Sequence, residues 1–394
     1  MKVIGLFAGV GGFEKGFELA GHEITGLCEL DADATVVLKR GFPAATLHSD
    51  INEFKELPPA TEVVLAGFPC QDLSQAGKMA GIEGSRSGLV NRVFDLVEHR
   101  KVDWIVFENV QNLIRLHGGA GISHVVRSLE RLGYSWAYRV VDTRAFGLPQ
   151  RRLRVFVVAS RVEDPCTVLF ADNAAPAWVA DDLFDPDTTA YGFYWTEGNR
   201  GVGWARDSIP TLKGGSAFGI PSPPAVWRPD HDDVEAFVTP GIDDAEALQG
   251  FDRGWSSLDA SDAARERRRW RMVGNAVSVP VAQWIGERMA APGSVELPLG
   301  VPVNGKWPLA ARGGPNERAM SVTVSTWPKN VPSLGLSSML THPASLSGRA
   351  AVGFYDRLIR STLRGGPDQF RRALAAYCTA KGFERNFTRA EPSA

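Results

Sequence analysis

Two apolar segments of this chain each end in a residue that can take part in covalent or acid–base chemistry. Cys70 follows Pro69 in a loop directly after the run Val63–Ala66, and Glu108 ends the run that begins at Trp104. In an open α/β sheet, ligands bind at the carboxyl ends of the strands, where both side chains would then lie. A thiolate is a nucleophile, and a glutamate held away from water can donate a proton. Each residue alone has an ordinary alternative: a lone cysteine is usually a small buried hydrophobe, and a lone carboxylate often bonds loop amides.

Arginines are grouped at two places. Arg152 and Arg154 alternate in sequence, which predicts that both point to one face of a strand, where they could hold a carbonyl, a phosphate or a carboxylate. The second group is the run from Arg265 to Arg271. This run is a candidate phosphate contact, with a solvated helix face as the alternative.

A glycine-rich turn near the N-terminus is typical of a nucleoside-binding site. The segment Phe7–Gly12 lies between an apolar run and a helical pattern, and its glycines let the backbone approach a ligand closely. Glu29, 20 residues after Gly9, could bind a ribose diol, and Asp50 an adenine amino group. Glu14 replaces the third glycine of the dinucleotide pattern, which favours a single nucleoside over a dinucleotide.

Alternating apolar and amphipathic segments in the first half predict a doubly wound, parallel α/β sheet with helices on both faces. The expected strands are Val3–Phe7, Ile24–Glu29, Val63–Ala66, Trp104–Phe107, Ala137–Val141 and Val155–Ala159, and the expected helices are Phe13–Leu19, Ala34–Lys39, Leu89–His99 and Val125–Leu132. A further helix, started by Pro280, is expected over residues 280–289. These elements would bring the candidate residues to one edge of the sheet.

Changes in composition and periodicity divide the chain into three parts. Residues 1–161, completed by 268–290, are expected to form a catalytic, cofactor-binding domain. Residues 162–267 are rich in Pro, Gly, Asp and Trp and predict a smaller, loop-rich domain. Residues 291–394 begin as a Pro/Gly-rich linker, across which we expect few contacts, and continue as a C-terminal extension. That extension could contact DNA, contact a partner or pack on the catalytic domain; its clustered arginines favour packing with some DNA contact.

Composition excludes several classes of protein. The chain has 394 residues, 44% hydrophobic and 22% charged, with a net charge of −2, which is typical of a globular protein rather than one coated by a polyanion. Its four cysteines stand far apart, which excludes a disulfide scaffold and the common zinc spacings. No apolar run reaches the roughly 20 residues of a membrane span. We expect a cytoplasmic protein with reduced thiols, no metal and no membrane partner.

Six segments, taken in order, resemble the motifs of the DNA (cytosine-5) methyltransferase family. They are Phe7–Gly12, Pro69-Cys70-Gln71, Glu108-Asn109-Val110, Gln150–Arg154, Leu248–Phe251 and Gly274–Pro280. The match covers residues 1 to about 290. The ninth motif of the family usually starts with arginines, where this chain has Val238–Ile242, and the residues from about 292 onward have no counterpart in its minimal form.

The resemblance implies a Rossmann-like fold that uses S-adenosylmethionine and transfers a methyl group to carbon 5 of a cytosine flipped out of DNA. It implies that Cys70 adds to carbon 6, Glu108 protonates or hydrogen-bonds ring nitrogen 3, Arg152 binds the base carbonyl and Arg154 orients the loop. The implied cofactor residues are Phe7, Gly9, Gly11, Gly12, Glu29, Leu30, Asp50, Ile51, Pro69, Asn275, Ala276 and Val277. The implied DNA contacts are Gln71, Ser74, Gln75, Thr211, Leu212, Arg267 and Arg268, and residues 162–267 become the target-recognition domain.

The resemblance leaves alternatives open. One branch of the family acts on tRNA with the same motifs, but the substantial recognition region and the basic C-terminal extension favour double-stranded DNA. A non-catalytic DNA-binding regulator is disfavoured, because Cys70, Glu108 and Arg152 are all present, and a cysteine hydrolase would need a matching histidine. We expect a monomer of the restriction–modification or host-modification kind, with a cognate restriction endonuclease as a candidate partner.

Overall fold

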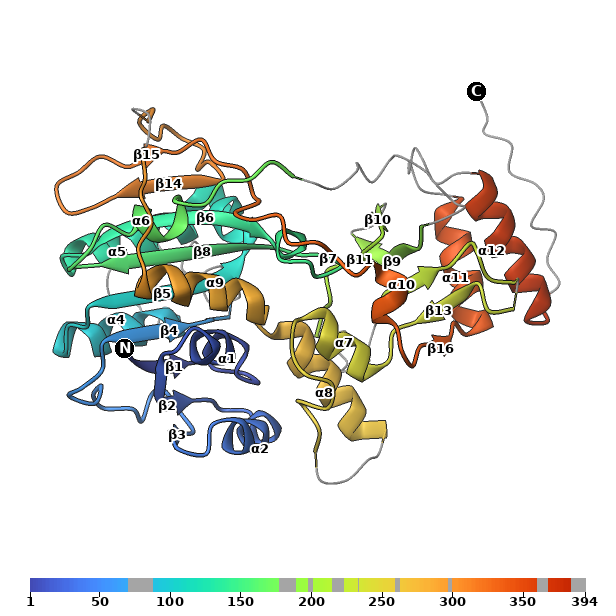
Figure 1. The fold of residues 1–394 in the computed structure, drawn as a ribbon, viewed down its shortest axis with the longest axis horizontal. Coiled ribbons are helices and arrows are strands. Elements are labelled where there is room, and N and C mark those ends of the chain that lie inside the picture. Colours follow the sequence, from blue (N-terminus) through green and yellow to red (C-terminus); the bar gives the residue numbers. More distant parts are fainter. Residues whose placement is uncertain are drawn as a thin grey trace.

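The protein has a large and a small domain, each built around its own sheet (Figure 1). The computed structural model describes residues 1–69, 88–176, 189–197, 201–214, 223–232, 234–258, 263–296, 300–359 and 368–383. The large domain holds a nine-stranded sheet and the small domain a five-stranded sheet. A two-stranded ribbon of β7 (Gln150–Arg151) and β11 (Ile209–Pro210) lies between them.

The strand order of the large sheet is β15-β14-β6-β8-β5-β4-β1-β2-β3. These strands are β1 (Lys2–Leu6), β2 (Glu23–Cys28), β3 (Thr46–His48), β4 (Val63–Ala66), β5 (Trp104–Val110), β6 (Ser135–Asp142), β8 (Leu153–Ser160), β14 (Ala310–Gly313) and β15 (Met320–Ser321). The expected doubly wound α/β fold is confirmed, but parallel pairing between neighbouring strands of this sheet is confined to β1 to β5. β8 is antiparallel to both β5 and β6, because the connection of residues 143–152 is too short for a crossover helix.

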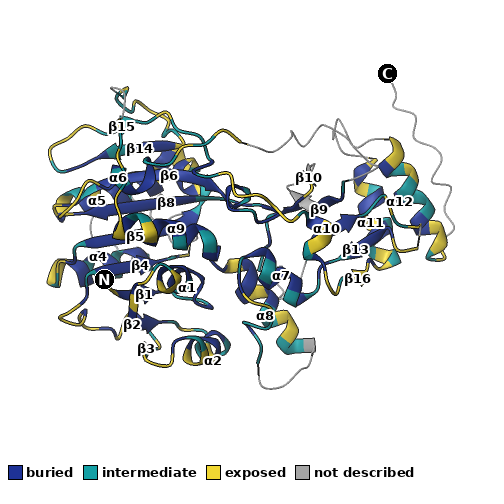
Figure 2. Cartoon of the chain, in the orientation of Figure 1, coloured by how far each residue is buried: buried dark blue, intermediate teal, exposed yellow. Residues whose placement is uncertain are grey.

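Helices cover both faces of the large sheet. α1 (Gly12–Leu19), α6 (Cys166–Leu169) and α9 (Val279–Ala290) pack on one face, and α4 (Leu89–His99) and α5 (Ala120–Arg131) pack on the other. α2 (Ala32–Gly41) lies beside β2 and β3, and the 3₁₀ helices are η1 (Gln111–Ile114), η2 (Leu116–Gly119) and η3 (Thr143–Ala145). β4 is buried along its whole length, and β1 and β5 at every residue but one (Figure 2), which explains their continuous apolar sequence.

The small domain is a sheet packed against two helices from the end of the chain. Its strand order is β10-β9-β12-β13-β16, with β9 (Tyr191–Glu197), β10 (Gly201–Arg206), β12 (Ala225–Trp227), β13 (Phe237–Thr239) and β16 (Ala344–Ser345). α11 (Gly348–Leu358) and α12 (Asp368–Ala380) cover the sheet. Their core is aromatic and contains Tyr191, Phe193, Trp204, Trp227, Phe237, Phe354, Phe370 and Tyr377. This region is therefore an ordered sheet domain where the sequence predicted a loop-rich one.

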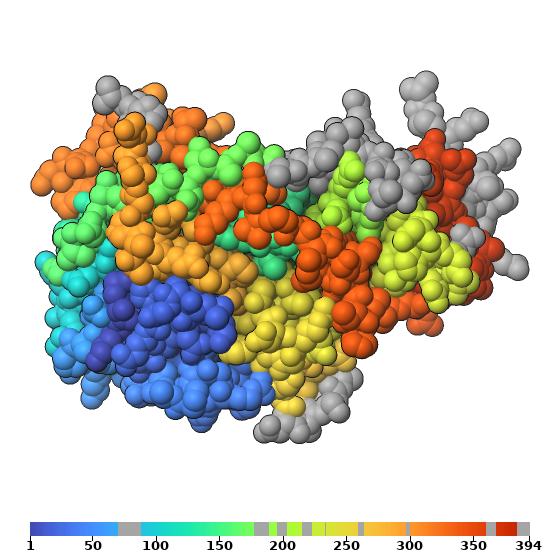
Figure 3. Space-filling model, in the orientation of Figure 1, coloured from blue at the N-terminus to red at the C-terminus, as the bar shows by residue number. Residues whose placement is uncertain are grey.

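The chain after residue 291 contributes to both domains. β14 extends the large sheet by pairing with β6, and β16 extends the small sheet by pairing with β13. Between them the chain forms the short helix α10 (Leu336–Met339), and in Figure 3 its orange and red residues lie on both halves of the molecule. The expectation that few contacts cross a linker at this point does not describe this structure, because both sheets use strands from this segment. A linker-like composition gave no sign of these long-range pairings.

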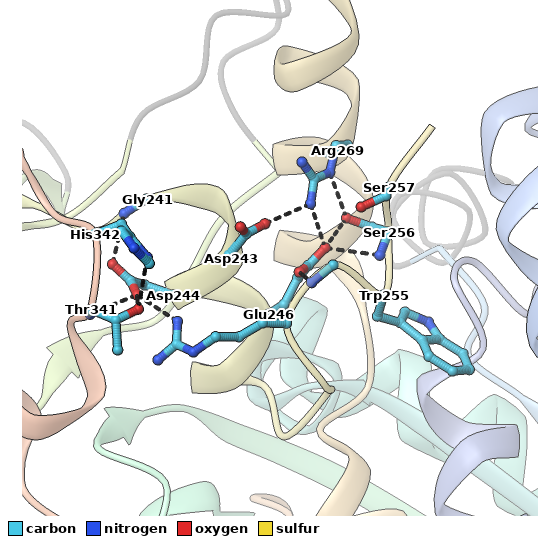
Figure 4. A network of polar contacts seen from close by, with 12 residues as sticks. Gly241, Asp243, Asp244, Glu246, Trp255, Ser256, Ser257, Arg269, Thr341 and His342 are labelled. Atoms are coloured by element: carbon cyan, nitrogen blue, oxygen red, sulfur yellow. Dashed lines mark hydrogen bonds and ion pairs between the residues drawn. The ribbon is translucent and has the colours of Figure 1, made fainter. Parts of the chain in front are cut away.

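Two helices connect the domains through a buried network of charges (Figure 4). α7 (Ile242–Leu248) carries Asp244 and Glu246, and both carboxylates are fully buried. Arg269 of α8 (Ala263–Asn275) donates to Glu246 at 2.9 Å, and Thr341, beyond α10, donates its amide to Asp244 at 3.0 Å. Buried carboxylates that are fully hydrogen-bonded specify one arrangement, so this network fixes α7, α8 and the C-terminal segment together.

Candidate active site

The glycine-rich turn after β1 forms an open cradle at the sheet edge. Phe7 and Gly9 both have positive φ, 57° and 56°, and for a phenylalanine that conformation is strained. A Cβ on Gly9 would meet nothing within 4 Å, so the backbone there faces open space. A Cβ on Gly12 would stand 2.2 Å from the carbonyl oxygen of Val277. The turn therefore leaves room for a ligand at Gly9 and is closed at Gly12 by the segment before α9.

Two carboxylates border this cradle, as the sequence predicted. Glu29 directly follows β2 and accepts hydrogen bonds from the amides of Gly9 and Asp31, each at 2.7 Å. Asp50 follows β3 and accepts the amide of Asn52 at 2.8 Å. Leu30 lies between them in sequence with 75% of its surface exposed. Carboxylate oxygens keep further acceptor capacity, and an exposed apolar side chain can stack on a base, so these residues fit a nucleoside.

Glu108 and Arg154 form an ion pair near the ends of β5 and β8. Arg154 Nε lies 3.0 Å from Glu108 Oε1, and both side chains are largely buried. Glu108 Oε2 faces Gly67 at the end of β4, 3.9 Å from where a Cβ of that glycine would stand. Burial raises the pKa of Glu108, and the guanidinium groups of Arg154 and Arg152 offset part of that rise. This carboxyl group therefore keeps a proton to higher pH than an exposed glutamate, which a general acid near neutral pH requires.

Asn109 ties the end of β5 to the segment that leads to Cys70. Its amide nitrogen donates to the carbonyl of Phe68 at 2.9 Å, and its oxygen accepts the amide of Val110 at 2.9 Å. Phe68 is buried, and Pro69 is exposed. Cys70, Gln71, Ser74 and Gln75 lie outside the described residues. The backbone two residues before the candidate nucleophile is thus fixed next to the candidate acid.

Arg152 lies apart from the Glu108 pair. Its Nη1 donates to the carbonyls of Leu212 and Gly274, each at 3.1 Å, and its Nη2 donates to the carbonyl of Ala276 at 2.8 Å. The resemblance implied the base carbonyl for Arg152 and loop orientation for Arg154; in the structure Arg154 faces the Glu108 carboxylate and Arg152 bonds backbone carbonyls, and which arginine meets the base stays a prediction. Arg152 stands between β7 and β8, outside the strand ladder, so the two-residue alternation did not fix where it bonds.

The remaining predicted cofactor residues close the cradle from the side of α9. Ala276 and Val277 are buried, and Asn275 is exposed. Gly11 has a φ of 83°, and Ile51 is buried beneath the Asp50 turn. The predicted cofactor residues from Phe7 to Pro69 thus follow the carboxyl ends of β1, β2, β3 and β4, and Val277 lies against Gly12; their contact with a cofactor stays a prediction.

The residues predicted to contact DNA differ in exposure and in whether they already bond other groups of the protein. Thr211 donates its hydroxyl to the carbonyl of Arg151 at 2.7 Å, and Leu212 is buried. Arg268 forms an ion pair with Asp33 at the start of α2. Arg267 is exposed. Other members of the arginine run also bind carboxylates of this chain: Arg269 pairs with Asp243 and Glu246, and Arg271 with Asp31. The run is therefore in part a connection between helices.

Several site residues escaped the sequence reasoning. Gln150 Oε1 accepts the amide of Leu212 at 3.0 Å, and Gln249 Nε2 donates to the carbonyl of Val273 at 3.0 Å. Both glutamines lay inside recognised motifs, but their sequence context carried no sign of what they bind. Glu14 was counted against a dinucleotide, yet it is buried under the glycine turn, and burial raises its pKa to about 8 with a further contribution from Glu29.

The described residues hold no group of three or more His, Cys, Asp or Glu side chains arranged for a metal ion. Within the same part of the chain, no helix has the length and apolar character needed to cross a membrane. Cys28, Cys166 and Cys378 are buried and unpaired, and burial raises the pKa of each thiol, to about 11 for Cys28 and Cys378. These three thiols are poor nucleophiles near neutral pH.

Known proteins share both the sequence and the fold. A family model of C-5 cytosine-specific DNA methylases matches residues 1–180. Type II methyltransferase M2.BsuMI of Bacillus subtilis (strain 168) is 46% identical over 383 residues, covering 95% of this chain and 97% of that protein. Type II methyltransferase M.NgoBV of Neisseria gonorrhoeae is 32% identical over 179 residues, 42% of each chain. The Dnmt2 methyltransferase structure from S. pombe shares the fold with a TM-score of 0.54 and 16% identity, covering 74% of this chain and 99% of that one. The resemblance is thereby confirmed, and the chain belongs to the C-5 cytosine-specific DNA methylase family.

Proposed function

We propose that this protein transfers a methyl group from S-adenosylmethionine to carbon 5 of a cytosine in a specific double-stranded DNA sequence. The observation that carries the proposal is the buried Glu108–Arg154 pair at the carboxyl edge of the sheet, with Asn109 fixing the backbone that leads to Cys70. The name of the Bacillus relative, a type II methyltransferase that this chain matches over nearly its whole length, supports DNA as the substrate and the restriction–modification kind of system.

The cradle after β1 would hold the cofactor. Part of the cofactor would lie against the open backbone at Gly9. Glu29 would bind its ribose hydroxyls, Asp50 would bind its adenine amino group, and Leu30 would pack on one face of the adenine. S-adenosylmethionine, when bound, supplies an electrophilic methyl group on a sulfonium.

The protein groups would activate the base. Cytosine carbon 5 is a weak nucleophile, so the Cys70 thiolate would add to carbon 6 and place electron density on carbon 5. Glu108 would donate a proton or a hydrogen bond to ring nitrogen 3, and we assign the base carbonyl to Arg154 rather than Arg152, because Arg154 is the arginine beside Glu108. After methyl transfer, loss of the carbon 5 proton and departure of the Cys70 sulfur restore the ring.

Cysteine usage supports this assignment. Cys28, Cys166 and Cys378 are buried with raised pKa values, so Cys70 is the cysteine left to act as nucleophile. A base stacked in a duplex cannot reach a thiol held on a loop, so the target cytosine must leave the helix. The small domain, with Thr211 and Leu212 at its junction with the sheet, would read the sequence around it. Such a protein would work at the nucleoid, with a restriction endonuclease of the same specificity as its natural counterpart.

A covalent trap tests the proposal. Bisulfite sequencing of DNA from expressing cells identifies the target, and a duplex with 5-fluorocytosine at that position blocks elimination after methyl transfer. We expect an adduct that survives denaturing electrophoresis, requires S-adenosylmethionine and maps to Cys70.

Cys70→Ser should abolish the adduct while DNA binding persists, because phosphate contacts elsewhere supply most of the affinity. Cys378→Ser, the matched control, should form it normally. An adduct in Cys70→Ser, or one mapped to another cysteine, contradicts the mechanism. An adduct on tRNA but none on duplex DNA would favour the RNA-modifying alternative.

A further inference from the structure

Arg152 joins two segments that the chain places far apart. One is the segment Ile209–Gly214, which we call the recognition segment; the other is the turn Gly274–Ser278 before α9, which we call the pocket turn. Arg152 donates to Leu212 in the first and to Gly274 and Ala276 in the second, at 2.8 to 3.1 Å. Its side chain is 1% exposed, so water does not compete for these bonds.

The two segments also touch backbone to backbone. A Cβ on Gly274 would stand 2.3 Å from the carbonyl carbon of Lys213 and 2.6 Å from the amide nitrogen of Gly214. A Cβ on Gly214 would in turn stand 2.7 Å from Oδ1 of Asn275. With no side chain between them to absorb a shift, a displacement of one segment is passed directly to the other.

The pocket turn borders the cofactor cradle on its other side. The carbonyl oxygen of Val277 lies 2.2 Å from the position of a Cβ on Gly12, and the Val277 side chain faces Gly67. Arg271 of α8, directly before the pocket turn, pairs with Asp31, which follows the Glu29 carboxylate by two residues. A ligand that fills the cradle therefore presses on, or is held by, the pocket turn.

The charge of Arg152 makes the two segments interdependent. In the described structure its guanidinium hydrogen-bonds backbone carbonyls, and Nε has no hydrogen-bond partner there. Burial lowers the pKa of Arg152 and the like charge of Arg154 adds to this effect, while the Glu108 carboxylate offsets part of it; the hydrogen bonds to the cation come from those backbone carbonyls. Removing a hydrogen-bond partner from a buried cation is strongly destabilising. Movement of either segment away from Arg152 therefore raises the free energy of the folded protein.

We propose that Arg152 is a positioning residue through which occupancy of the cofactor cradle orders the recognition segment. The inference rests on the proposed function and adds a coupling to it: the enzyme would present its DNA-reading segment in the correct place only when the methyl donor is bound. Gln150 and Gln249 form a second connection, but it needs two side chains: Gln150 accepts the amide of Leu212 and donates to Gln249, and Gln249 donates to the carbonyl of Ala276 at 3.4 Å and accepts the hydroxyl of Ser278 at 2.8 Å. Arg152 alone among these side chains bonds both segments directly.

Hydrogen–deuterium exchange on the full-length protein tests the coupling without DNA. The probe is S-adenosylhomocysteine, and the reporter is the amide of Leu212, which donates to Gln150. Saturating probe should slow exchange in residues 272–278 directly and in residues 209–214 by at least about fivefold, the lower end of typical allosteric couplings. If the probe binds and slows exchange only in residues 272–278, the coupling is overturned. If calorimetry detects no binding of the probe, the proposed cofactor, and not the coupling, has failed.

Three variants test whether the coupling needs the hydrogen bonds of Arg152 or only a positive charge nearby. In Arg152→Met, the probe should still protect residues 272–278 but change exchange in residues 209–214 by less than about twofold. Arg154→Met is the matched control: it removes the neighbouring arginine, which pairs with Glu108, and should keep the response of residues 209–214. Arg152→Lys keeps the charge but lacks the fork that spans both segments, so it should behave as Arg152→Met. If residues 209–214 respond to the probe in Arg152→Lys or Arg152→Met as they do in the native protein, the proposed role of Arg152 is wrong.

Discussion

The large and the small domain are assembled in opposite ways along the chain. Seven strands of the large sheet, β1 to β6 and β8, come from the first 160 residues, and α1, α2, α4 and α5 alternate with the first of them along the chain. The core of the small domain instead combines β9 to β13 with α11 and α12, more than a hundred residues later. The proposed chemistry thus belongs to the large domain, whose fold is specified by local sequence patterns. Target reading is proposed for the small domain, whose core depends on contacts between segments far apart in the sequence.

The two arrangements carry different vulnerabilities. In the large domain, candidate catalytic groups stand at strand ends, so they can be altered without removing core side chains. In the small domain, Phe370 contacts aromatic rings from four strands, including Phe193 and Trp227, and Tyr377 donates its hydroxyl to the carbonyl of Leu346. Removing part of the C-terminal segment should therefore destabilise the small domain, although most strands of that domain come from a much earlier part of the sequence.

The largest expected effect is a truncation that ends the chain after His342. It removes β16, α11 and α12 but leaves β14 in the large sheet. We expect the small domain to lose its fold, because its aromatic core loses one wall, while the large domain stays ordered. Hydrogen exchange should become unprotected in residues 191–239 and stay native in β1, β4 and β5. Native protection of β9 and β12 would contradict the proposed dependence.

Glu108→Gln should reduce methyl transfer by about 10² to 10⁴, because an amide cannot supply the proton that a carboxylic acid can. Single-turnover transfer from labelled S-adenosylmethionine to chromosomal DNA of a host without the enzyme measures the loss. Hydrogen exchange in the small domain should be unchanged, which separates chemistry from target reading. Glu98→Gln on the exposed side of α4 is the control and should transfer at the native rate. Near-native transfer by Glu108→Gln would remove that residue from the mechanism.

Phe370→Ala is a point version of the truncation. Phe370 is fully buried, and truncating a buried phenylalanine costs about 3 to 5 kcal/mol. We expect protease cleavage to increase within the small domain, with no change in the affinity of the large domain for S-adenosylhomocysteine. Ile359→Ala, at a residue that is 40% exposed, should have a much smaller effect. Equal protease sensitivity of the two variants would mean that α12 contributes little to this core.

The first half of the fold could be predicted because its signals are local. β4 and α4 have the predicted bounds, and Glu29 stands at the end of β2 as expected, although its hydrogen bond to Gly9 had no sign in the sequence. The antiparallel placement of β8 and the pairing of β14 with β6 depend on contacts across the chain, and a pattern of apolar residues does not say which strand pairs with which. The division of labour between Arg152 and Arg154 escaped prediction for a similar reason. Their distinct partners, Leu212 and Glu108, come from different parts of the sequence.

A smaller, pH-dependent effect should come from Glu14. Burial raises its pKa to about 8 in the folded protein, against about 4.5 when exposed, so the folded state binds the extra proton between these values. Native stability should therefore fall as the pH rises from 5 to 8, by up to about 1.4 kcal/mol per pH unit from this group. Urea unfolding of Glu14→Gln should show a stability gain over the native protein that grows across this window and is level above it.

Glu18→Gln is the control for that measurement. Glu18 is exposed on the same helix, where it pairs with Lys15 at 2.8 Å, and its replacement should shift stability by a small amount that does not grow with pH between 5 and 8. A Glu14→Gln profile parallel to that of the native protein would show that Glu14 is ionised in the fold. The difference between the two glutamates would confine the pH effect to the core beneath the glycine turn of the large domain.

The smallest expected effects separate two neighbouring arginines on α8, which lies between the domains. Arg267 is exposed, whereas Arg268 is held by Asp33 of α2. If α8 faces DNA, Arg267→Ala should lower the slope of log affinity against log salt by about 1, the value for one phosphate contact. Arg268→Ala should leave that slope nearly unchanged, because its charge is already compensated within the protein. Titrations of a fluorescent duplex at several salt concentrations measure both. Equal losses of slope would show that the Asp33 pair opens when DNA binds, and no loss in either would assign the whole arginine run to the connection between the domains.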